Sequence, residues 1–240
     1  MRPFLGTLAL SLTVLTASTA AAQSAPADPT GHWEGTITAP MGQIDFEVDV
    51  AREAPGTLVA TYGQKATGVR GLPLTQVGLD GSTFTFVLFT GGPGGGAFKG
   101  DMLSDGKTIS GEVKATMGSA PFMLYRTGDA VLAPKVKNTA VSKTLEGRWT
   151  GSLDVGGTQI TVILTIANRV DGTASALIAQ ASEPGLQLEA AMHESGSAVA
   201  FEVPATSGAW KGTLANDSMP GTWTQPGGSL PLTFTRAQTN

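Results

Sequence analysis

The chain has 240 residues, with 15 basic and 19 acidic side chains and no cysteine. This acidic balance argues against nucleic acid and anionic membrane surfaces as partners. The lack of cysteine excludes disulfide bonds, a thiolate metal site, a cysteine nucleophile and a lipid attached through cysteine, so stability must come from burial of a hydrophobic core.

The first 22 residues have the pattern of a secretory signal peptide. Arg2 is followed by an apolar stretch that starts at Phe4, and small residues then lead to Ala22. A basic start, a short apolar segment and a small-residue cleavage site are the three parts of such a signal. The apolar stretch is too short for a permanent membrane span. We therefore expect cleavage near Ala22, export to the periplasm or the extracellular medium, and residues 23–30 as an N-terminal lead.

The sequence after this lead is an internal repeat. The residues GHWEG that begin at Gly31 recur as GRWTG at Gly147, which is 116 positions later. The offset falls to 110 where Arg126 matches Arg236 near the end of the chain. Such drift is what short insertions and deletions in the loops of one shared fold produce. The repeat therefore predicts two copies of one module.

These copies define the domain organisation. We place the first module at 31–128 and the second at 145–240. Residues 129–144 join them and contain Pro134, three lysines and no apolar periodicity. This composition predicts an extended linker.

Within each module the dominant pattern is alternation of apolar and polar residues, with turn residues about every 8 to 12 positions and no sustained helical spacing. In the clearest segment Phe46, Val48 and Val50 alternate with carboxylates, which predicts one buried and one solvated face. The pattern predicts eight strands in the first module, near 32–39, 43–52, 57–65, 72–79, 82–90, 96–103, 108–116 and 119–126.

Strands of this kind are best accommodated by a closed barrel. Closure removes the exposed edges that a flat antiparallel sheet would leave. We therefore predict an all-β chain of two tandem eight-stranded antiparallel up-and-down β-barrels, joined by the linker and preceded by the signal peptide. A two-layer sandwich of the same strands is the alternative.

Four residues are candidates for closing the barrels. Trp33 and Trp149 share strand parity with inward apolar residues at the start of each module, and Arg126 and Arg236 do so at its end. Closure makes the first and last strands neighbours, so each arginine can stack on an indole and donate to carbonyls at one end of the barrel. This pattern resembles the lipocalin and calycin barrels, whose Gly-x-Trp opening and terminal arginine seal one end. The resemblance implies an interior that binds a ligand.

A second resemblance covers almost all of each module. It rests on GRWTG at 147–151, on Phe201-Glu202-Val203-Pro204, on Trp210-Lys211-Gly212 and on GTWTQPGGSLPLTFTR at 221–236. These runs are similar to the β-rich accessory domain that lies N-terminal to the catalytic domain in some secreted bacterial serine hydrolases. In those proteins the chemistry belongs to the following domain. The resemblance therefore implies a non-catalytic role.

The sequence offers no convincing catalytic group. Its two histidines, His32 and His193, fall at unrelated places in the two modules, and no His-x-x-x-His pair or Gly-x-Ser-x-Gly motif is present. Although Glu194 and Ser195 follow His193, neighbours along the chain cannot converge on one substrate without partners from elsewhere. We predict no catalytic residues.

The same conclusion holds for metals and cofactors. The carboxylates Asp45, Glu47 and Asp49 lie on the predicted wet face of their strand, and the second module has Thr161 and Ile163 at the first two of these positions. A solvated surface explains them. We predict no metal site and no cofactor.

The interior of the second module is the better prospect for a ligand. An eight-stranded barrel is either filled by side chains or just wide enough for one small molecule. Five phenylalanines fall on the inner rows of the first module, whereas the second has smaller residues there. We predict a cavity lined by Leu164, Phe201 and Leu232.

These inferences combine into one functional prediction. The chain is expected to be an exported, non-catalytic binding or accessory protein. Its partner is predicted to be an apolar small molecule, a glycan or another exported protein. A lipocalin-like carrier of a small apolar ligand is the alternative, and an unrecognised hydrolase is a third hypothesis.

Overall fold

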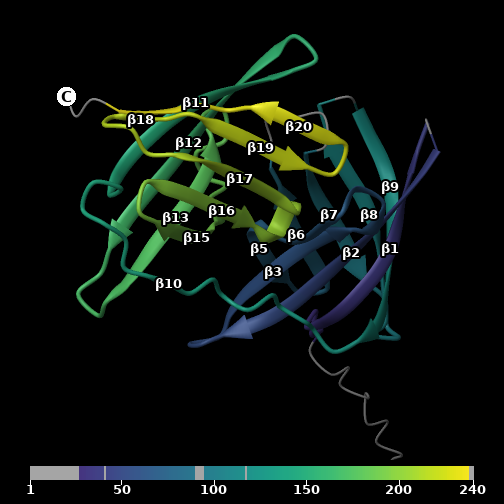
Figure 1. Cartoon of the computed structure of the whole chain (residues 1–240). Coiled ribbons are helices and arrows are strands. Elements are labelled where there is room, and N and C mark those ends of the chain that lie inside the picture. Colours follow the sequence, from purple (N-terminus) through teal and green to yellow (C-terminus); the bar gives the residue numbers. More distant parts are fainter. Residues whose placement is uncertain (1–26, 41, 90–94, 117, 238–240) are drawn as a thin grey trace, which may run out of the picture.

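The computed structural model describes residues 27–40, 42–89, 95–116 and 118–237 (Figure 1). The regular structure of these residues consists of β-strands and two short 3-10 helices, so the all-β prediction is confirmed for them. The predicted signal peptide and residues 23–26 of the lead lie outside the described residues. No helix of the described ranges has the length and hydrophobicity to cross a membrane.

A single antiparallel sheet forms the first half, drawn in purple to teal (Figure 1). Its nine strands follow the order β4-β3-β2-β1-β9-β8-β7-β6-β5. They are β1 (Gly31–Ala39), β2 (Gly42–Glu53), β3 (Thr57–Gln64), β4 (Val69–Pro73), β5 (Thr75–Asp80), β6 (Thr83–Leu88), β7 (Gly96–Met102), β8 (Thr108–Ala115) and β9 (Gly118–Gly128).

The sheet curls into a nearly closed barrel with one seam. The two edge strands, β4 and β5, are separated in the chain only by Leu74, whose N–H donates to the Ala60 carbonyl of β3 at 2.9 Å. The chain therefore crosses from one edge of the sheet to the other at this residue. The prediction of eight strands is wrong by one, because the expected strand 72–79 is divided at the seam.

The second half keeps this strand order but is hydrogen-bonded as two sheets. One sheet has the order β10-β13-β12-β11-β21-β18, with β14 beside β13, and the other has the order β15-β16-β17-β19-β20. The strands are β10 (Asn138–Thr139), β11 (Gly147–Val155), β12 (Thr158–Asn168), β13 (Thr173–Gln180), β14 (Leu188–Glu189), β15 (Ala191–Ser195), β16 (Ala198–Val203), β17 (Gly208–Thr213), β18 (Ser218–Met219), β19 (Gly221–Gln225), β20 (Gly228–Pro231) and β21 (Phe234–Arg236).

Two seams separate these sheets. At the first, Ala190 donates its N–H to the Ala176 carbonyl at 2.9 Å, as Leu74 does in the first half. The second seam has no counterpart in the first half. Pro220 lies between β18 and β19, and the segment opposite is interrupted at Thr233, between β20 and β21. A proline has no N–H to give to a sheet. The expected continuous eight-stranded barrel is therefore too simple for this half.

Aromatic side chains fill both interiors. In the first half the rings of Phe86 and Phe98 stack with centroids 4.5 Å apart. In the second half Phe201 stacks on Trp210 at 5.4 Å, and Trp210 meets Phe234 edge-on at 5.6 Å. All five side chains are buried. Each half thus has its own hydrophobic core.

The predicted linker, 129–144, is bound along the second half instead of hanging free. Within it Asn138 is buried, and β10 pairs with β13 (Figure 1). The Asn138 side-chain amide donates to the Ala190 carbonyl at 2.9 Å and accepts from the Met192 N–H at 2.8 Å. The Val131 N–H donates to the Asp49 carboxylate at 2.8 Å, which ties the start of this segment to the first half.

We expect Asn138→Ala to lower the free energy of unfolding by about 1–3 kcal/mol, because the Ala190 carbonyl and the Met192 N–H would lose their shared partner. Urea denaturation would measure the loss. Thr139→Ala, at the exposed neighbour in the same strand, is the matched control. Equal midpoints for the two variants would contradict the structural role of Asn138.

The two halves meet through their short helices, η1 (Lys65–Thr67) and η2 (Pro204–Thr206). The Ser207 hydroxyl, directly after η2, donates to the Gly68 carbonyl after η1 at 2.9 Å. Nearby, Leu186, Leu188 and Ala205 of the second half pack against the core of the first. The junction is therefore partly apolar.

Candidate functional site

An apolar cleft of about 530 Å³ lies at the junction of the two halves. The first half contributes Val69, Leu72 and Phe89, and the second half contributes most of the lining. Pockets for small ligands commonly occupy about 300–1,000 Å³. The cleft is therefore large enough for a small molecule.

The alternation of the second repeat builds this cleft. Leu153 and Val155 continue the inward row of β11 to the end of the strand, and β12 contributes Ile160, which is opposite Leu153, and Val162. Leu153 and Val162 belong to the buried core of the second half and Ile160 packs against it, whereas Val155 is 42% exposed at the end of its strand. The cleft is thus the open end of the second interior, covered in part by the first half.

A few polar groups border the apolar surface. Gln180, Glu183, Thr206 and Gln225 belong to the lining. The Trp223 indole N–H donates to the Gln225 side-chain oxygen at 2.8 Å, so this ring presents its apolar surface while its polar atom has a partner. Such a lining suits a mostly apolar ligand, with orientation left to a few polar contacts.

The predicted cavity residues are divided by the structure. Leu232 lines the cleft, whereas Leu164 and Phe201 are fully buried in the core behind it. The expected cavity among these three residues is filled, because Trp210 and Phe234 pack on Phe201. Alignment of the two repeats could have predicted that this interior is filled, because Trp210 stands at the position of Phe98, one of the rings that fill the first module.

The predicted barrel-closing residues lie in pairs. Arg126 is opposite Trp33 in the β1–β9 ladder, with its guanidinium 4.8 Å from the ring centroid. Arg236 is opposite Trp149 in the β11–β21 ladder, at 4.2 Å. Both indoles are completely buried. Each arginine also donates to backbone carbonyls: Arg126 to Asp28, and Arg236 to Thr144 and Glu146. Their contribution to stability stays a prediction, which mutation can test.

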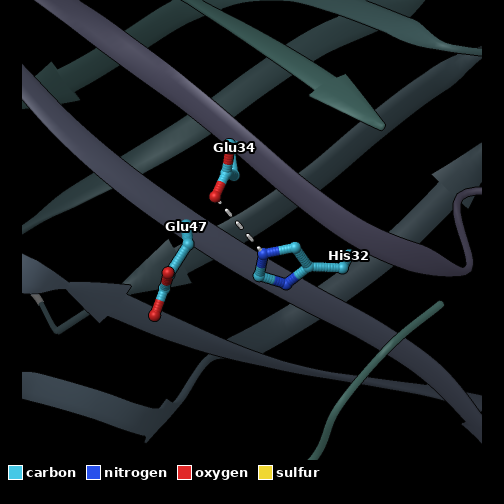
Figure 2. Close-up of side chains that lie close together, drawn as sticks. All are labelled: His32, Glu34 and Glu47. Atoms are coloured by element: carbon cyan, nitrogen blue, oxygen red, sulfur yellow. Dashed lines mark ion pairs between the residues drawn. The ribbon is translucent and has the colours of Figure 1, made fainter. Parts of the chain in front are cut away.

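A second group of side chains gathers on the outer face of the first half (Figure 2). His32 and Glu34 extend from β1 and Glu47 from β2, with donor atoms all within 4.8 Å of one another. Glu34 and Glu47 are direct cross-strand partners. Alternation along the strand predicts a solvated face for Glu47, but only the β1–β2 register brings it close to His32.

Charged neighbours surround this cluster. His32 Nδ1 is 2.8 Å from Asp49 Oδ1 and Nε2 is 3.8 Å from Glu34 Oε1. The Lys65 ammonium lies 3.1 Å from Glu34 and 3.5 Å from Glu47. The hydrogen bond from Lys65 lowers the pKa of Glu34, and Glu34 in turn raises the pKa of Lys65. A surface groove of about 690 Å³, lined in part by Glu34, Glu47 and Lys65, opens beside the cluster.

No protein-family model and no curated protein matches the chain. Among solved structures it is similar to the crystal structure of a protein of unknown function of the DUF3598 family from Nostoc punctiforme. The two are 14% identical, the match covers 87% of this chain and 96% of that one, and the TM-score is 0.28. A likeness at this score supports no argument about fold or function. The resemblance to serine hydrolase accessory domains therefore stays a prediction.

Proposed function

We propose that the chain is an exported, non-catalytic binding protein that holds an apolar small molecule in the cleft between its halves. The observation that carries this proposal is the cleft itself: about 530 Å³ of space, lined mainly by aliphatic and aromatic side chains. Each methylene group that a ligand buries there contributes roughly 0.8 kcal/mol. A ligand with a short hydrocarbon chain or a fused ring would suffice for useful affinity.

The carrier function also fits the architecture. We interpret the second half as a lipocalin-like barrel with two seams, because its strand order follows that of the nearly closed first half. In this interpretation the first half has a filled interior and supports the second half, while the second half keeps one end open for the ligand. A glycan or a protein partner accounts less directly for so apolar a lining.

The placement of the histidines supports a role without catalysis. His32 lies on the outer face of β1, away from the cleft, between carboxylates. His193 and Glu194 are adjacent on β15, so alternation directs them to opposite faces. The Glu194 carboxylate accepts hydrogen bonds from Ser142, in the linker. The sequence His193-Glu194-Ser195 is therefore arranged as a strand with a docking contact, unlike a catalytic triad.

We expect the neutral fluorescent probe N-phenyl-1-naphthylamine to bind the purified full chain saturably, with low-micromolar affinity. Val155→Glu should weaken this binding about tenfold, because a carboxylate at the mouth would have to lose water beside the bound probe. Val155 is 42% exposed, so the fold should tolerate the change. Fluorescence titration would measure both affinities.

Val170→Glu is the matched control, since Val170 is fully exposed in a turn of the same half and is not part of the cleft. It should bind the probe like the unmodified chain. The bound probe should also quench tryptophan fluorescence. Trp223→Phe should remove most of this quenching while retaining the binding, because Trp223 is the only tryptophan among the cleft residues described. Absence of saturable binding, or equal affinities for the two glutamate variants, would overturn the proposal.

A further inference from the structure

We propose that His32, Glu34 and Glu47 bind one divalent transition-metal ion on the outer face of β1 and β2, with zinc as the test ion. This site is separate from the apolar cleft and does not depend on the proposed carrier function. It revises the sequence-based expectation that the chain has no metal site.

The donor set and its spacing fit zinc. One imidazole nitrogen and two carboxylates form a mixed nitrogen and oxygen set, which zinc accepts and which calcium and magnesium do not prefer. Metal–ligand distances of about 2.0–2.1 Å in a tetrahedral site place two ligand atoms roughly 3.3 Å apart. His32 Nε2 and Glu34 Oε1 are 3.8 Å apart, and all three donors lie within 4.8 Å (Figure 2). Small side-chain rotations would complete the geometry.

Asp49, a fourth residue outside this donor set, orients the histidine. Its carboxylate is 2.8 Å from His32 Nδ1, and it also accepts the Val131 N–H at 2.8 Å. The Asp49 side chain is only 13% exposed and is therefore held from two sides. A proton on Nδ1 leaves the lone pair of Nε2 directed toward Glu34. This arrangement of carboxylate, histidine and ligand position is the one that supports metal-bound histidines in proteins.

A cation already bridges the two carboxylates. The Lys65 ammonium lies 3.1 Å from Glu34 and 3.5 Å from Glu47, so the protein itself shows that positive charge is stabilised between them. The Lys65 side chain is 68% exposed and can move into solvent when an ion arrives. Lys65 is therefore a competitor for the ion rather than a ligand, and the adjoining groove gives the ion a path from solvent.

The second half offers an internal comparison. At the positions equivalent to His32, Glu34 and Glu47 it has Arg148, Thr150 and Ile163, which cannot form the same site. The second half forms the same strand pairing without these three donors. The pairing therefore does not explain why the first half has them. We therefore expect one ion for each chain.

The test is a zinc titration of the full chain at pH 7 after treatment with a chelator, followed by isothermal calorimetry. We expect one zinc per chain. His32→Ala and Glu47→Gln should each lower the affinity at least tenfold, and Asp49→Asn should lower it about tenfold through the orientation of His32. Lys65→Ala should raise the affinity several-fold, because it removes the competing cation. A general attraction of zinc to surface carboxylates would not be weakened by His32→Ala, because histidine carries no negative charge.

Glu112→Gln, an exposed carboxylate on β8 outside the cluster, is the control and should leave zinc binding unchanged. Circular dichroism of each variant would establish that it is folded. In the folded unmodified chain, zinc should also shift the nitrogen resonance of His32 Nε2 more than that of Nδ1. Lack of stoichiometric binding, retention of full affinity in His32→Ala, or weaker binding in Lys65→Ala would overturn the proposal.

Discussion

Trp149→Ala is expected to lower the free energy of unfolding by about 3–5 kcal/mol. The indole is completely buried, its N–H donates to the Leu145 carbonyl at 3.0 Å, and the Arg236 guanidinium lies over the ring at 4.2 Å. Truncation would leave a cavity, an unpaired carbonyl and an arginine without its platform. The midpoint of thermal unfolding should fall by roughly 10 °C for a chain of this size.

Substitution of Arg236 separates the contribution of the arginine to this loss of stability from that of the Trp149 indole. Arg236→Lys would keep the positive charge near Trp149 but lose the planar fork that donates to two backbone carbonyls. We expect it to cost about 1–2 kcal/mol. Val170→Ala, at a fully exposed position, is the control and should have almost no effect. If Trp149→Ala melted like this control, Trp149 and Arg236 would have no role in closing the second half.

The second large effect is expected at Gly35. Gly35→Ala should lower the free energy of unfolding by about 3 kcal/mol, at the upper end for an overpacked site. A Cβ atom at Gly35 would lie 2.0 Å from the Met123 carbonyl oxygen and 2.8 Å from the Leu124 side chain. The carbonyl belongs to the backbone of β9, so the two strands would have to separate. Chemical denaturation monitored by circular dichroism would measure the loss.

Gly128→Ala is the matched control, because Gly128 lies on β9 and a Cβ there would meet open space. We expect a change within about 0.5 kcal/mol. Similar losses for the two variants would show that the strand propensity of alanine against glycine, and not the close approach of β1 to β9, determines the effect. Gly151, the equivalent of Gly35, has the same constraint: a Cβ would lie 2.6 Å from Leu232 and 2.9 Å from the Thr233 carbonyl.

These two predictions explain the repeated motif Gly-x-Trp-x-Gly. Its tryptophan is the platform for the terminal arginine, and its last glycine lets the final strand pass close to the first. Parity along a strand was enough to predict the arginine–tryptophan pairs, because side chains alternate strictly in extended chain. The reason for the glycine could not be predicted, because it depends on the separation of two strands that are about 90 residues apart in the sequence.

The candidate sites were less accessible to sequence analysis. The cleft is made by the end of one half and the flank of the other, and alternation within a strand contains no information on how two halves dock. Leu232 was expected at a cavity and lies at the cleft, but Leu164 and Phe201 do not, because both are buried in the core, where Trp210 stacks on Phe201. His32, Glu34 and Glu47 meet only through the β1–β2 register.

The sequence by itself determined that the chain is all-β, that it repeats, and that tryptophan and arginine face inward at the ends of each repeat. These properties follow from local alternation and from self-similarity, both of which are visible in one dimension. The tertiary structure alone decided the ninth strand, the two sheets of the second half and the cleft. Each of these depends on which backbone groups still find hydrogen-bond partners, and on how much apolar surface is covered, once distant segments come together.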